Sequence, residues 1–159
     1  MKIGIVSDTH SIELPEKLLQ DFRKVDFIIH AGDFCGIEDL QKLTKIQEVT
    51  AVHGNMDGRD IRQIFPRKQI FKIAAFRIGL FHGEGPATTI LERVHSEFVK
   101  DKVDCIIFGH SHQPFNKTID QILYFNPGSP NDRIGTPYCS YGILEVTNNK
   151  IVGKLIKVK

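Results

Sequence analysis

Residues that can hold a metal ion recur along this chain in short clusters. Asp8 and His10 are separated by one residue and follow the apolar run 3–6, which predicts a buried strand. At the end of an extended strand, two side chains with this spacing point to the same side. They combine a hard oxygen donor with a borderline nitrogen donor, which makes half of a metal site. A metal site is therefore predicted only if other parts of the chain bring further ligands to the same place.

Matching ligands follow four further apolar runs. Asp33, Asn55 and His82 each come just after one run, and His110 and His112 both follow another. In an open α/β sheet the loops at the carboxyl ends of the strands converge, and ligands bind there. Turn formation explains any one cluster equally well, because turns favour Asp, Asn and Gly. Turns do not require four histidines, so the clusters together favour one metal-binding site.

The set of ligands suits two metal ions better than one. Two carboxylates, one amide oxygen and four imidazoles exceed what a single tetrahedral site needs. Two ions roughly 3.5–4 Å apart can clamp a phosphate and acidify a bridging water. Mixed oxygen and nitrogen ligands favour transition metals over magnesium or calcium. We expect two divalent transition metal ions, with manganese ahead of nickel, iron, zinc or cobalt.

The elements that must position these residues alternate in the first part of the chain. Apolar patterns predict strands at residues 3–6, 25–29 and 49–52, with helices around 14–22, 37–43 and 61–64. This βαβαβ order predicts a parallel sheet with right-handed crossovers.

The second part of the chain follows a different pattern. It predicts a hairpin at 69–73 and 77–81, a helix at 90–98, and strands at 105–108, 115–119, 123–125, 140–146 and 151–158. No repeat or linker interrupts the chain. We therefore expect a single domain, residues 1–159, of the α/β class with two sheets and flanking helices.

Composition limits the kinds of partner and the cellular compartment that we expect. The net charge of +2 on 159 residues gives no strong nucleic-acid signal, and no apolar run is long enough to span a membrane. Met1 leads directly into the first predicted strand, so we expect no signal peptide. Cys35, Cys105 and Cys139 form neither a zinc-ribbon spacing nor a disulfide framework. We expect a cytoplasmic protein; homo-oligomer formation through edge strands of the last third stays open.

Five blocks, in order, resemble the signature of the calcineurin-like metallophosphoesterases. They are Asp8-Thr9-His10, Gly32-Asp33, Gly54-Asn55-Met56-Asp57, His82-Gly83 and Gly109-His110-Ser111-His112. The stretch Asn126-Pro127-Gly128-Ser129 further resembles the small bacterial and archaeal phosphodiesterase branch of this superfamily. The resemblance implies a four-layer α-β-β-α sandwich of two mixed sheets flanked by helices.

The resemblance also implies a dinuclear site with assigned ligands. The first ion would be held by Asp8, His10, Asp33 and His112. The second would be held by Asp33, Asn55, His82 and His110, so that Asp33 bridges the two ions.

The implied activity is hydrolysis of a small phosphodiester substrate. A hydroxide that bridges the metals would attack phosphorus in line, with Asp33, Asn55 and His82 around the developing charge. Asp57 is expected to orient its neighbours. The alternative is a non-catalytic metal-binding scaffold or protein-interaction module, because a retromer subunit that serves mainly as a scaffold resembles this branch. The sequence keeps all seven ligands, which favours an enzyme.

Met56 departs from the family pattern. Many members have a histidine at this position that protonates the leaving group, and a thioether cannot donate a proton. General acid catalysis contributes roughly 100- to 10,000-fold. We therefore expect aryl phosphodiesters, which have good leaving groups, to be hydrolysed better than alkyl phosphodiesters.

Other residues are expected to lie outside the site or leave two readings open. His30 and His53 read as structural or supporting histidines, His95 as a surface residue and Cys35 as a small buried apolar residue rather than a ligand. Arg133 could meet a phosphate or be a solvated loop residue. Residues 126–129 could form a simple turn or line the site. Glu84 stands where relatives often have another histidine, and the sequence assigns it no role.

Overall fold

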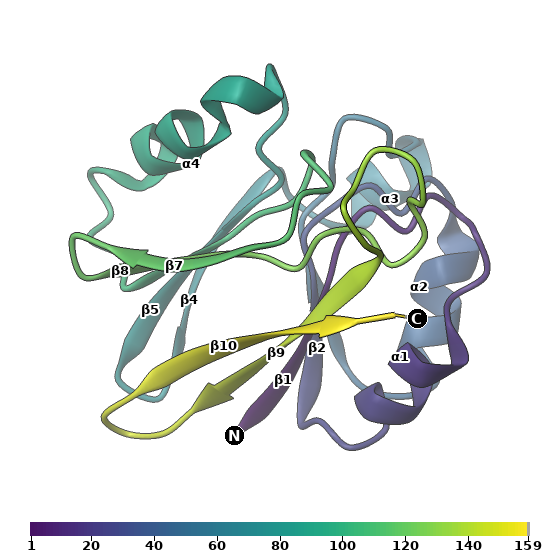
Figure 1. The fold of residues 1–159 in the computed structure, drawn as a ribbon, viewed down its shortest axis with the longest axis horizontal. Coiled ribbons are helices and arrows are strands. Elements are labelled where there is room, and N and C mark those ends of the chain that lie inside the picture. The colour runs from purple at the N-terminus through teal and green to yellow at the C-terminus, as the bar shows by residue number, and fades with distance from the viewer. Residues whose placement is uncertain (159) are drawn as a thin grey trace.

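Two five-stranded sheets lie face to face in the computed structural model, which describes residues 1–158 (Figure 1). The first sheet has the order β10-β9-β1-β2-β3. Its strands are β1 (Lys2–Val6), β2 (Phe27–His30), β3 (Val49–Ala51), β9 (Ser140–Val146) and β10 (Ile151–Lys157). The first three strands are parallel, as the βαβαβ pattern predicts, and β9 adds to β1 in the antiparallel direction.

The second sheet has the order β4-β5-β6-β8-β7. Its strands are β4 (Lys68–Ile73), β5 (Phe76–Phe81), β6 (Cys105–Ile107), β7 (Phe115–Ile119) and β8 (Ile122–Asn126). The central three strands are parallel, and the antiparallel strands β4 and β7 form the edges. Both sheets are therefore mixed, as the resemblance implies.

Helices cover the outer face of each sheet (Figure 1). The first sheet carries α1 (Glu16–Phe22), α2 (Ile37–Thr44) and α3 (Arg59–Ile64). The second carries α4 (Ile90–Phe98), which the short 3-10 helix η1 (Ala87–Thr89) precedes. The expected four-layer α-β-β-α sandwich is confirmed. None of the helices in residues 1–158 has the length and apolar character that crossing a membrane requires.

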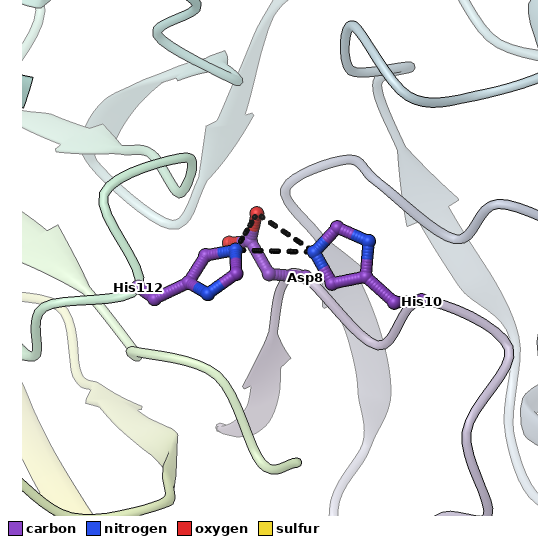
Figure 2. A group of neighbouring side chains, drawn as sticks. All are labelled: Asp8, His10 and His112. Carbon is purple, nitrogen blue, oxygen red and sulfur yellow. Dashed lines mark hydrogen bonds and ion pairs between the residues drawn. The ribbon is translucent and has the colours of Figure 1, made fainter. Parts of the chain in front are cut away.

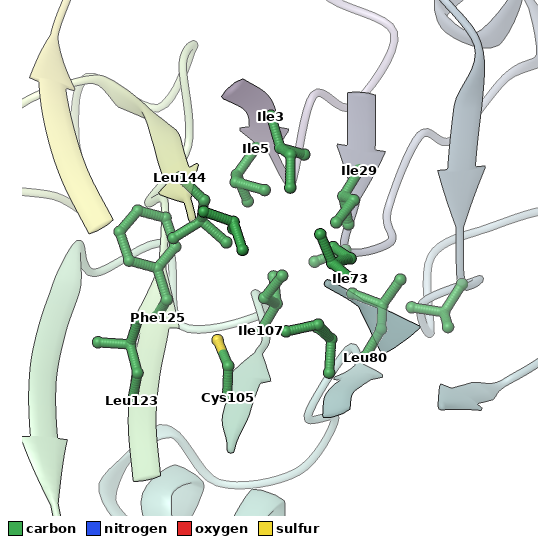
Figure 3. Packing of buried hydrophobic residues seen from close by; sticks show 14 residues of the cluster. Ile3, Ile5, Ile29, Ile73, Leu80, Cys105, Ile107, Leu123, Phe125 and Leu144 are labelled. Carbon is green, nitrogen blue, oxygen red and sulfur yellow. The ribbon is translucent and has the colours of Figure 1, made fainter. Parts of the chain in front are cut away.

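Three apolar clusters fill the three spaces between the four layers. The cluster between the sheets includes Ile5, Ile107 and Phe125, all fully buried (Figure 3). The other two pack the helices onto their sheets, around Phe22 on one side and Phe98 on the other. Because β1 is covered on both faces, it needs an unbroken apolar run rather than an alternating one.

Element boundaries lie within two residues of the predicted ones. The first helix begins at Glu16 because Pro15 takes the N-cap position with an extended ψ of 135°. The turn between β7 and β8 contains Asp120 and Gln121, whose φ angles are 48° and 67°. Positive φ at both central residues is typical of a tight type I′ hairpin turn, so the turn predicted at these two residues is confirmed.

Candidate metal centre

Backbone hydrogen bonds join the loops that follow β1, β2, β5 and β6. The amide of Asp8 donates to the carbonyl of Gly32 at 2.9 Å, and the amide of His10 donates to the carbonyl of Asp33 at 3.1 Å. The amide of Gly109 donates to the carbonyl of His82 at 3.0 Å, which links the two loops of the second sheet. The amide of His110 donates to Asp8 Oδ2 at 3.0 Å, so the predicted ligand loops of the two sheets meet at one place.

Asp8, His10 and His112 form the first group of potential metal ligands, with one ligand atom of each within 4.8 Å of the others. Figure 2 shows both imidazoles directed at each other and at the Asp8 carboxylate. The His112 Nε2 lies 3.3 Å from Asp8 Oδ1 and 3.1 Å from His10 Nε2. Two ligands of one tetrahedral ion lie about 3.4 Å apart when each is about 2.1 Å from the metal. The spacing of this group therefore fits one transition metal ion.

Asp33, His82 and His110 form the second group, again within 4.8 Å. The His82 Nε2 lies 3.2 Å from Asp33 Oδ2 and 3.9 Å from Asp8 Oδ1. His82 thus lies next to carboxylates of both groups, and the two groups are adjacent. Asn55 follows β3 and is exposed.

Two buried polar atoms at this centre have no hydrogen-bond partner among residues 1–158. They are Asp8 Oδ1 and His82 Nε2. An unpaired buried polar group costs roughly 1–3 kcal/mol, and more when it is charged. A cation between the two groups would satisfy both atoms, so these residues fit a metal ion better than they fit one another.

Hydrogen bonds fix the ring orientation of His82 and His112. The Nδ1–H of His82 donates to the carbonyl of Ala31 at 2.8 Å, and the Nδ1–H of His112 donates to Asp132 Oδ2 at 2.7 Å. Neither oxygen is expected to donate a proton, so the proton lies on Nδ1 of each ring. In the neutral ring the Nε2 lone pair then points at the centre, as in metal-binding histidines generally.

The other two histidines are held in the same way. The Nε2 of His110 lies 2.7 Å from the carbonyl of Gly85, which leaves Nδ1 for the centre. The Nδ1 of His10 lies 3.1 Å from Cys35 Sγ, which leaves Nε2 for the centre. Cys35 is half-buried rather than fully buried, and its thiol supports a candidate ligand. It belongs to neither candidate ligand group.

Neighbouring side chains of opposite charge together outweigh burial in setting the pKa values of aspartates and histidines at this centre. Burial alone raises the pKa of the Asp8 and Asp33 carboxyls, but the neighbouring imidazoles of His112 and His82 outweigh it and lower both values. Burial lowers the pKa of His82, yet Asp33 and Asp8 raise it to about 9. The Asp8 carboxylate, whose Oδ1 lies 3.3 Å from Nε2, is the largest cause that raises the pKa of His112 to about 9. A metal ion that binds here must displace these protons.

Asp57 connects the second and third ligand loops without belonging to either ligand group. Its carboxylate accepts hydrogen bonds from the amides of Asp33, Cys35 and Gly54 at 2.9, 2.9 and 2.7 Å. The amide of Met56 donates to Asp33 Oδ1 at 2.8 Å, while the Met56 side chain is largely exposed. This geometry agrees with the expectation that Asp57 orients its neighbours.

Five of the seven predicted ligands have a left-handed backbone. Their φ angles lie between 53° and 65°, for Asp8, His10, Asp33, His110 and His112. This conformation costs roughly 1 kcal/mol or more per non-glycine residue and clusters at functional sites. The left-handed residues aim the side chains at a common centre, which regular strand or helix geometry would not do.

Two glycines allow these loops to approach closely. A Cβ atom on Gly54 would collide with Asp33 Oδ1, and one on Gly109 would collide with Ser7 Oγ and lie 2.7 Å from Asp8 Oδ2. No side chain larger than hydrogen fits either position without moving a predicted ligand. The sequence-based expectation that glycines permit close backbone approach is met at both positions.

Residues 126–132 hold the ligand loops from behind, and the role of Asp132 was not predicted from the sequence. The Asn126 side chain donates to the carbonyl of Gly109 at 2.8 Å, and Ser129 Oγ donates to the carbonyl of Asp8 at 2.8 Å. These contacts favour a site-supporting role for residues 126–129 over a simple turn. Asp132 lies in a loop rich in turn-forming residues, and nothing in one sequence links it to His112.

The histidines set aside lie where the sequence indicates. His30 is fully buried, lies 3.2 Å from Thr9 Oγ1 and stacks on Phe34, and burial lowers its pKa to about 3. His53 is half-buried, and His95 is exposed with its Nδ1 2.6 Å from the Tyr124 hydroxyl.

The structure also shows the surroundings of Arg133 and Glu84, whose roles the sequence leaves open. Arg133 is exposed, which favours the solvated reading. Glu84 accepts a hydrogen bond from Arg67 Nε at 2.8 Å, so its partner is an arginine beside the site rather than a predicted ligand.

Comparison with known proteins agrees with this geometry. Residues 1–149 match the family model of the calcineurin-like phosphoesterase superfamily domain. A probable metallophosphoesterase of Methanothermobacter thermautotrophicus is 35% identical over 162 residues, covering 99% of this chain and 92% of that protein. Vacuolar protein sorting 29 from Cryptosporidium parvum has a TM-score of 0.85 at 22% identity, covering 99% of this chain and 91% of the other. An archaeal phosphodiesterase has a TM-score of 0.76 at 25% identity, covering 98% and 100%.

Proposed function

The chain belongs to the calcineurin-like phosphoesterase superfamily, as its five sequence blocks predict, and on that premise we propose that it is a phosphodiesterase with two divalent metal ions. The observation that carries this proposal is the pair of buried, unpartnered ligand atoms, Asp8 Oδ1 and His82 Nε2, between two adjacent ligand groups. We treat residues 1–159 as one catalytic domain.

The proposed ligands follow the two groups. Asp8, His10 and His112 would hold the first ion, and His82, His110 and the Asn55 carboxamide would hold the second. Asp33 would be shared between the two ions, and its Oδ1 accepts a hydrogen bond from the Met56 amide. Manganese is the proposed native metal. When bound, two such ions would supply an activated water as the nucleophile and would neutralise charge on the phosphate.

The chain itself supplies orientation around the reacting phosphate. Asp57 keeps the Asp33 and Asn55 loops in register through three amide hydrogen bonds. The hydrogen-bond acceptors of His82 and His112, the Ala31 carbonyl and the Asp132 carboxylate, keep the ring proton on Nδ1, so that the ligand nitrogens stay fixed during turnover. Asn55 and His82 are the residues that we propose to stabilise the charge that develops on the phosphate oxygens.

The leaving group receives no proton from residue 56. Met56 is 59% exposed, so its side chain extends towards solvent and offers no acidic hydrogen. An aryl oxide leaves without a proton because its conjugate acid is far stronger than an alkyl alcohol. We therefore propose aryl or similarly activated phosphodiesters as the preferred substrates.

The second candidate is a non-catalytic scaffold. The likeness to vacuolar protein sorting 29 favours it, although at 22% identity that likeness concerns the fold alone. A scaffold does not need four imidazoles held in ligand tautomers, and this arrangement favours the enzyme.

Activity of metal-stripped protein decides between the two. Bis(p-nitrophenyl) phosphate should be hydrolysed after manganese is added back and not in the presence of EDTA. Asp33→Asn should abolish this activity, whereas Asp60→Asn, at an exposed carboxylate of α3, should keep it. Equal rates with and without EDTA, or full activity in Asp33→Asn, would contradict the proposal.

A further inference from the structure

A cavity of about 330 Å³ lies between α4 and the loop that carries two of the predicted ligands. Its lining is mainly apolar, with Ile90 and Leu91 on one wall and Phe108 and Phe115 on the other. This volume lies at the lower end of the range for small-molecule pockets, roughly 300–1,000 Å³. A cavity of this size holds one small ring system rather than an extended molecule.

The cavity adjoins the metal centre. Ser111, which lines it, stands in the chain between the predicted ligands His110 and His112. The hydrogen bond from His110 to the carbonyl of Gly85 links the ligand loop to the α4 side, because Gly85 lies two residues before Ala87, where the lining segment begins. The cavity therefore borders the loop that carries His110 and His112.

We propose that this cavity binds an aromatic ring carried by the phosphodiester substrate. The half-buried Phe115 offers aromatic surface against which a planar ring packs favourably, and the buried Phe108 lies next to it, with ring centroids 6.4 Å apart. The only charged side chain in the lining is Glu92, so a substituent with a further phosphate would be repelled. Ser111 and Gln113 supply a few polar contacts at the wall nearest the centre. The presence of a phosphate at the metal centre rests on the proposed function, whereas binding of the aromatic ring rests on the cavity alone.

Filling the cavity tests the proposal. Thr88 is exposed and lines the cavity, so Thr88→Trp should occupy it without disturbing the core; Ala87→Phe is a second filling variant. Thr118→Trp, at an exposed position of β7 outside the lining, is the matched control. Phenyl phosphate and methyl phosphate are compared as inhibitors of the manganese-loaded enzyme.

We expect phenyl phosphate to inhibit about tenfold more tightly than methyl phosphate, since part of the ring's apolar surface leaves water. Thr88→Trp and Ala87→Phe should remove this advantage and leave inhibition by methyl phosphate unchanged, whereas Thr118→Trp should change neither. An advantage that survives both filling variants would overturn the proposal.

A titration with phenol provides a readout that needs neither metal nor turnover. In methyl NMR spectra of the metal-free protein, phenol should shift the resonances of Ile90 and Leu91, and Thr88→Trp should suppress the shifts. Absence of any shift at these methyl groups would overturn the proposal. If the protein hydrolyses no diester, the proposed function fails while the phenol titration still decides what the cavity binds.

Discussion

Replacing Asp132 with asparagine tests whether the hydrogen bonds behind the imidazoles set the metal affinity. Asp132 Oδ1 accepts from the amides of Ile134 and Gly135, and an asparagine oxygen can keep both contacts. The new NH₂ group would then occupy the position of Oδ2, 2.7 Å from His112 Nδ1. Because an NH₂ group donates, Nδ1 must accept, and the ring proton moves to Nε2. The Nε2 lone pair is then lost to the metal.

The expected effect is a 10- to 100-fold loss of metal affinity, which corresponds to about 1.4–2.7 kcal/mol. Loss of the Asp132 charge should also lower the pKa of His112 from about 9, although Asp8 remains its largest raising cause. Calorimetric titration of metal-free protein measures the affinity. ¹⁵N NMR of the imidazole nitrogens above pH 9, where the ring is neutral, reports the tautomer. Asp60→Asn is the control for a lost surface charge.

Two results would refute this reasoning. If Asp132→Asn binds metal within twofold of the unmodified protein while the NMR spectrum shows the tautomer reversed, the orientation of His112 does not limit affinity. If the tautomer itself does not change, the hydrogen bond to Asp132 does not control it.

Three further changes have defined outcomes. Met56→His, at an exposed position, should raise kcat on alkyl diesters by roughly 100-fold or more with little change on aryl diesters; no gain on alkyl substrates in a steady-state assay would contradict the leaving-group proposal. The pKa of His30 is lowered to about 3, so the unfolded chain binds an extra proton between pH 6.5 and 3 and stability falls as pH falls. Urea unfolding of metal-free protein should therefore lose up to about 1.4 kcal/mol per pH unit more than His30→Asn in this window, and parallel pH curves would show that His30 is not the cause. Gly109→Ala should abolish metal binding, because its Cβ would collide with Ser7 and crowd Asp8; calorimetric titration with unchanged affinity would show that the loop can move aside.

Most of the fold follows from local patterns in the sequence. The apolar runs that form β1, β2 and β3 alternate with helices, and this order predicts a parallel sheet. A helix that connects two such strands crosses over the sheet, so that both strands run in the same direction. The sequence does not reveal that β9 returns to pair with β1, since this pairing joins segments far apart in the chain. The patterns predict two sheets, but without that pairing they do not tell which strands join which sheet, five in each.

The candidate site likewise has one part that could be predicted from the sequence and one part that could not. The clusters around Asp8, Asp33 and His82 could be found because each directly follows an apolar run. The roles of Asp132 and Cys35 could not, because each depends on a contact between distant loops. The left-handed backbone of the ligands also escapes prediction, since aspartate and histidine adopt several loop conformations and only the hydrogen-bonded loops select one.

The most direct test of the proposed centre is the number and spacing of the ions that one chain binds. Metal-free protein is titrated with manganese, the bound metal is counted by elemental analysis, and the electron paramagnetic resonance spectrum is recorded at each step. We predict two ions per chain and the spectrum of a magnetically coupled pair, and loss of the pair in Asp33→Asn. One ion per chain, or two ions without magnetic coupling, would contradict a dinuclear centre bridged by Asp33.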